Sequence, residues 1–152
     1  MFHLFQPDYI EWPVSVDLPA AKGGVTKPYK FTAHFRVLDE EDAQALQDQH
    51  NQMLVAMRKR LEVLQGYNKD EEVMTEPLPC TYQELVDEVL CGWGDEVVDE
   101  DGEPIEFNEA TKAKLYRVQG AAAAIFKAWD DSLGQPTQKS AAKAGGFRAK
   151  NS

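Results

Sequence analysis

The side chains that could do chemistry are few and widely spaced along this chain. The histidines are His3, His34 and His50, and the cysteines are Cys80 and Cys91. Neither cysteine belongs to a CxxC pair or to a Cys/His cluster, so the ligand spacing of a zinc site is missing. No GxSxG, HExxH, P-loop or GxGxxG motif occurs in the sequence. We therefore expect no enzyme activity, no catalytic residue, no bound metal and no cofactor.

Carboxylates are the most abundant reactive groups, and they are concentrated in one segment. The formal net charge is −10, and residues 66–111 contain fifteen Asp and Glu residues and one lysine. An EF-hand with Gly102 as its sixth residue would need Val97 and Asn108 as its first and twelfth residues, and neither type fits. We interpret the segment as a solvated face that favours solubility, or as a surface for a basic or neutral partner. Nucleic acid is disfavoured as a partner, except through the basic C-terminal tail.

The sequence gives no indication of a membrane segment. No stretch approaches the roughly 18 apolar residues of a membrane-spanning helix. The first residues lack the positive region and apolar run of a secretory signal. We expect a cytoplasmic protein with no membrane partner, in which Cys80 and Cys91 are reduced, mostly buried thiols.

Two strands are expected near the N-terminus. Residues 12–18 and 29–38 both alternate between apolar and polar side chains, which is typical of strands with one buried face. Residues 20–28 contain Gly23-Gly24 and Pro28 and are expected to form a turn or loop between them. The two strands should pair antiparallel. His34 falls on the polar face, where exposure to solvent is the expected state.

A long helix should follow, because Asp39 can cap it and no Gly or Pro interrupts the chain before Gly66. Its apolar residues recur at steps of three and four, and a stripe of this kind usually packs into the core. Because methionine adapts to varied surfaces, an alternative is a docking groove for a partner. His50 is expected to be a packing residue. The stripe comprises Leu46, His50, Met53, Leu54, Met57, Leu61 and Leu64.

Three shorter helices and a hairpin are expected in the C-terminal part. Thr81 and Glu84 form a capping box for a helix that should run to Gly92. The Asp101-Gly102 pair predicts the turn of a short hairpin. Asn108 should cap a helix that ends near Val118, and a last helix should follow over 121–133. Trp93 and the large side chains of that last helix are the expected core anchors: Ile125, Phe126 and Trp129.

These elements predict an α+β fold with a small antiparallel N-terminal sheet, one long central helix and a C-terminal part of three short helices. We expect residues 1–134 to form a single globular domain. Residues 135–152 carry four basic and no acidic residues, with little apolar surface to bury. We therefore expect a disordered basic tail there.

The C-terminal part also resembles a known family. The segment VLCGWGDEVVDEDGEPIEFNEATKAKLYRVQGAAAAIFKAWDDSL, residues 89–133, is followed by FRAKN in the tail. Its Gly-Trp turn, its acidic Val-Val-Asp-x-Asp-Gly-x-Pro loop and its helix of small residues with aromatic anchors resemble the phage tail assembly chaperones of long-tailed bacteriophages and prophages. The strand FTAHFRVLDEED that leads into a long helix is similar to one branch of that family.

The resemblance implies a protein that works without catalysis in the host bacterial cytoplasm. Such a chaperone binds the tape measure protein, a very long, helical and apolar chain, and keeps it soluble while tail tube subunits assemble. The tail tube protein is a second candidate partner, and self-association is a further alternative. Two other classes remain open: a minor structural or tail-completion protein of the virion, and a small acidic regulator or inhibitor. The expected partner-binding residues are Met53, Met57 and Leu61, joined by Phe126 and Trp129 if these two are exposed rather than buried.

Overall fold

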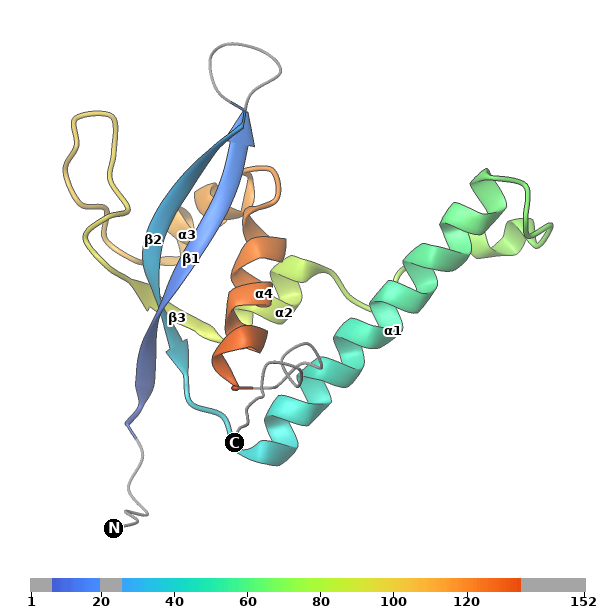
Figure 1. Cartoon of the computed structure of the whole chain (residues 1–152), viewed down its shortest axis with the longest axis horizontal. Helices are drawn as coiled ribbons and strands as arrows, with labels where there is room; N and C mark the ends of the chain where they lie inside the picture. The colour runs from blue at the N-terminus through green and yellow to red at the C-terminus, as the bar shows by residue number, and fades with distance from the viewer. Residues whose placement is uncertain (1–6, 20–25, 135–152) are drawn as a thin grey trace, which may run out of the picture.

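The computed structural model describes residues 7–19 and 26–134 (Figure 1). The predicted tail at 135–152 and most of the predicted loop at 20–28 lie outside the described residues. The α+β class is confirmed, with an N-terminal antiparallel sheet, a long central helix and further short helices. The elements in chain order are β1 (Tyr9–Pro19), β2 (Thr26–Arg36), α1 (Glu40–Leu64), a 3-10 helix η1 (Glu71–Met74), α2 (Tyr82–Asp87), β3 (Leu90–Trp93), α3 (Glu109–Tyr116) and α4 (Ala121–Ser132).

The sheet has the order β1-β2-β3, with β2 in the centre and both neighbours antiparallel to it. The register places Val14 opposite Phe31 and Trp12 opposite Ala33. Because side chains alternate between the two faces of a strand, every second residue of β1 and β2 points to the same side. That side is the core face: Val14, Val16, Phe31, Ala33 and Phe35 are all buried.

The third strand was not predicted, and the helix expected to run to Gly92 ends five residues earlier. α2 begins at the predicted Thr81–Glu84 capping box but stops at Asp87. The chain then turns and runs along β2, where the amide of Gly94 donates to the carbonyl of Thr32 at 2.8 Å. A Cβ added at Gly92 would lie 2.9 Å from Nδ1 of His34. Glycine at this position therefore allows β3 to approach β2 closely.

Helix α4 supplies the largest side chains of the core. Ile125, Phe126 and Trp129 are almost fully buried. The helix packs against β1 and α2, so the three helices of the C-terminal part cover one side of the sheet (Figure 1). Its small buried residues leave room for this close approach. They are Ala121, Ala122 and Ala128.

Trp93 attaches the acidic segment after β3 to the core. The indole N–H of Trp93 donates to the carbonyl oxygen of Ile105 at 2.8 Å, and its ring meets Phe107 edge-on at 4.8 Å. The predicted hairpin is reduced to a single bridge between Val98 and Pro104. Asn108 then caps α3 together with Thr111, close to the predicted start of that helix.

Replacing Trp129 with alanine tests the assignment of α4 as the core of the fold. The side chain is 1% exposed, so its removal should lower the free energy of unfolding by about 3–5 kcal/mol. Tyr67→Ala is the matched control, since that aromatic side chain is 83% exposed and its loss should change stability by about 0.5 kcal/mol at most. Urea unfolding followed by circular dichroism measures both. Equal effects of the two substitutions would show that Trp129 is not a core anchor.

Candidate functional site

The structure separates the five residues expected to bind a partner into two groups. Met53, Phe126 and Trp129 are each 1% exposed and belong to the core, whereas Met57 is 43% and Leu61 51% exposed. The expectation for the first three is therefore corrected, because side chains without accessible surface cannot contact a partner in this conformation. Phe126 and Trp129 are covered by the elements around α4, and Met53 is the last buried residue of α1.

The first part of α1, residues 40–53, packs against the rest of the protein. We call the sheet together with α2, α3 and α4 the body. Ala43, Leu46 and Met53 are buried. The amide of Gln47 donates to the carboxylate of Asp130 in α4 at 2.7 Å. The Nε2 atom of His50 lies 3.0 Å from the hydroxyl oxygen of Tyr82 in α2. The ring of His50 also lies 4.7 Å from that of Phe126 in α4, centroid to centroid. His50 is thus a packing residue, as predicted, and it joins α1 to α2 and α4.

The remaining part of α1, residues 54–64, extends away from the body (Figure 1). The apolar side chains on it recur at steps of three and four and remain accessible over a large part of their surface. We call these four residues the outer stripe: Leu54 (41% exposed), Met57 (43%), Leu61 (51%) and Leu64 (70%). Helical periodicity gives the stripe one continuous face. The single stripe expected from the sequence is therefore core in its first part and accessible surface in its second.

A shallow hollow lies along the outer stripe. Its volume is about 460 Å³, and residues of both α1 and the following segment line it. Leu78 comes from that segment and faces the stripe from the side. We call this feature the outer hollow, and its lining residues are Met57, Arg58, Arg60, Leu61, Leu64 and Leu78.

The chain returns along α1 after the helix ends. Gly66 adopts a positive φ of 84°, which reverses the chain direction at the end of the helix. The guanidinium group of Arg60 donates to the main-chain carbonyl of Glu76. This bond links α1 to residues 66–79, which we call the returning segment. The thiol of Cys80 then lies 3.6 Å from the carbonyl oxygen of Gln49, near the place where α1 leaves the body. The returning segment thus provides the second wall of the outer hollow.

A second hollow of about 580 Å³ lies on another side of the same helix. Polar residues of α1 line it together with the returning segment, and its carboxylates come from Asp70 and Glu76. The apolar residues of α1 that line this second hollow are Val55 and Ala56. The two hollows differ in character, because the lining of the outer hollow contains two arginines and no carboxylate.

Reactive groups elsewhere have structural partners. Within the part of the chain that the structure describes, no group of three or more His, Cys, Asp and Glu residues could hold a metal ion. Burial raises the pKa of the Cys80 and Cys91 thiols, so both are protonated at neutral pH. The hydroxyl of Tyr116 donates to Asp87 at 2.6 Å, and burial together with that carboxylate raises the pKa of Tyr116. Over the described ranges, no helix is both long and apolar enough to cross a membrane.

Sequence reasoning missed Leu78 and the two arginines of the outer hollow. Arg58 and Arg60 belong to a basic run in the second half of the helix, and a helical wheel places them beside the stripe formed by Met57, Leu61 and Leu64. Leu78 stands between Pro77 and Pro79 in an acidic linker, where no periodicity connects it to the helix. A helical wheel could therefore have placed the arginines beside the stripe, whereas no spacing rule could have placed Leu78 there.

The contact of His50 with α4 and α2 predicts a pH dependence of stability. Burial lowers the pKa of His50 and outweighs the opposite effect of the Asp130 carboxylate. The unfolded chain therefore binds a proton more readily than the folded one, and the contribution of His50 to stability is lost as the pH falls below about 6.5.

Urea unfolding at about pH 7.5 and about pH 5.5 measures this effect. The native protein should lose more stability between the two pH values than His50→Gln, which does not titrate there. The comparison removes the shared contribution of the carboxylates. Equal losses in the two proteins would contradict the assignment.

Comparison of the chain with protein families, with characterised proteins and with solved structures found no match.

Proposed function

We propose that this protein is a phage tail assembly chaperone that holds the tape measure protein soluble without catalysing a reaction. The observation that carries the proposal is the outer stripe, an accessible apolar face of α1. It lies on the part of α1 that extends from the body (Figure 1). Support also comes from the sequence resemblance of residues 89–133. The partner expected for such a face is an amphipathic or apolar helix that lies along it.

The size of the stripe bears on how such a chaperone would work. Complete burial of a leucine or methionine side chain stabilises by about 1.5–3 kcal/mol, and the four side chains are already covered over 30–59% of their surface. The remaining gain is roughly 1 kcal/mol for each side chain, or about 4 kcal/mol together. Association costs are of the same order, so a single copy should bind weakly.

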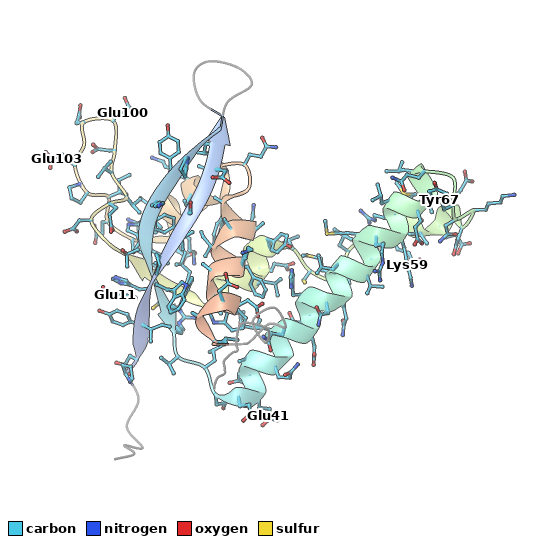
Figure 2. All side chains as sticks on the ribbon, in the orientation of Figure 1. Glu11, Glu41, Lys59, Tyr67, Glu100 and Glu103 are labelled. Atoms are coloured by element: carbon cyan, nitrogen blue, oxygen red, sulfur yellow. The ribbon has the colours of Figure 1, made fainter. Side chains whose placement is uncertain are left out.

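Weak binding suits a chain that must be released. A very long tape measure chain offers many apolar helical segments, and several chaperone molecules would cover it at once. Each molecule could be displaced separately as tail tube subunits assemble around the tape measure protein, in the host bacterial cytoplasm. The acidic segment at the opposite end of the molecule, where Glu100 and Glu103 lie, would keep the loaded complex in solution (Figure 2).

Co-expression with the tape measure protein encoded by the same phage or prophage tests the proposal. The native protein should keep the tape measure protein in the soluble fraction and co-purify with it. Leu61→Asp with Leu64→Asp should reduce the co-purified amount by about tenfold or more, because two of the four apolar contacts are replaced by charges.

Val98→Asp is the matched control, since Val98 is 45% exposed and lies on the acidic segment. This variant should retain the tape measure protein, and circular dichroism should show that all variants are folded. If the native protein leaves the tape measure protein insoluble, the proposed function is wrong. If this protein is found in purified phage particles, that result would instead favour a structural protein of the virion.

A further inference from the structure

Two arginines border the outer stripe, one on each side. Successive residues of an α-helix are separated by about 100° around its axis. With Met57, Leu61 and Leu64 on one face, Arg58 and Arg60 fall on its two flanks, and Lys59 falls on the opposite face. The lining of the hollows agrees with this arrangement. Arg58 lines the outer hollow, Lys59 lines the second hollow, and Arg60 lies between them and lines both.

Neither arginine forms an ion pair with another described residue, although Arg60 shares the second hollow with Asp70 and Glu76. The ion pairs among residues 7–19 and 26–134 join Lys112 to Asp87 and Glu109, and Lys127 to Asp131. None of them involves Arg58. Arg60 donates to a neutral main-chain carbonyl, that of Glu76, and keeps its charge. The lining of the outer hollow therefore carries two guanidinium groups in a protein whose formal net charge is −10.

We propose that the outer stripe selects an acidic amphipathic helix, with apolar side chains at steps of three and four and carboxylates on both flanks of that apolar face. Each arginine would pair with carboxylates on its own side of the stripe, because a guanidinium group matches a carboxylate in charge and in geometry. A helix with lysines on its flanks would meet two like charges and be rejected. This inference rests on the proposed function, and it names the class of tape measure segment that is held.

A second copy of this chain fits the stripe less well. Two stripes packed antiparallel about a two-fold axis would meet near residue 59, the midpoint of 54–64. Arg58 and Arg60 of one copy would then lie next to the same two residues of the other, and four positive charges would face one another. Charge complementarity therefore favours the acidic helix.

Three synthetic helical peptides test the proposal with the full-length protein. All have the same length and the same leucines at steps of three and four, and the flanking positions are Glu, Gln or Lys. Fluorescence anisotropy should give the tightest binding for the Glu peptide and the weakest for the Lys peptide, with a ratio of dissociation constants of about tenfold or more. The ratio should shrink when salt is raised from about 0.15 M to about 0.5 M, because screening weakens exposed charge pairs.

Two variants with the same net charge separate the flank from the overall charge. Arg58→Glu should abolish the preference for the Glu peptide, whereas Lys59→Glu, on the opposite face, should largely retain it. Arg58→Gln provides a milder variant, for which an intermediate preference is expected. Circular dichroism shows whether each variant is folded.

The outcomes distinguish this inference from the proposed function. Equal binding of the three peptides, or equal effects of Arg58→Glu and Lys59→Glu, would overturn the inference even if the tape measure protein is still held. If the protein prefers the Glu peptide but does not keep the tape measure protein soluble, the inference is supported and the proposed function is overturned. A dimer that Leu61→Asp with Leu64→Asp dissociates in sedimentation experiments would identify a second copy as the occupant and overturn the inference.

Discussion

Phe126 is the point at which α1, α2 and α4 meet. Its ring centroid lies 4.7 Å from that of His50 in α1, 6.2 Å from that of Tyr82 in α2 and 5.1 Å from that of Trp129 in α4. The orientation of α1 depends on this cluster, because the helix makes its buried contacts over residues 43–53. The direction in which the outer stripe points is therefore determined by buried side chains that are not part of the stripe.

The same anchoring explains why a stable fold can carry an accessible apolar face. The sheet, α2 and α4 bury the largest side chains without using the end of α1. Leu54, Met57, Leu61 and Leu64 are therefore not needed to close the core. The chain can keep arginines beside them, and the charge of this surface is opposite to that of the acidic segment 95–106 at the other end of the molecule.

Local signals in the sequence predicted most element boundaries. Asp39 and Gly66 enclose the long helix, and Thr81 and Asn108 cap the helices expected after them. β3 was missed because Leu85, Val86, Val89 and Leu90 follow a helical spacing, whereas pairing with β2 determines the conformation from Leu90 onward. The stripe on α1 shows the other limit. Periodicity identifies an apolar face, but it cannot distinguish the part that is buried against the body from the part that stays largely accessible.

Because Cys80 lies beside Gln49, the chain leaves the body and returns to it at almost the same place. Residues 54–79 lie between these two points, beyond the last buried residue of α1, and the packing of the sheet or of α4 does not constrain their length. Whole helical turns could be gained or lost in α1, with matching changes in the returning segment, while the entry and exit points stay together. Evolution could thus change how far this surface extends from the body without changing the rest of the fold.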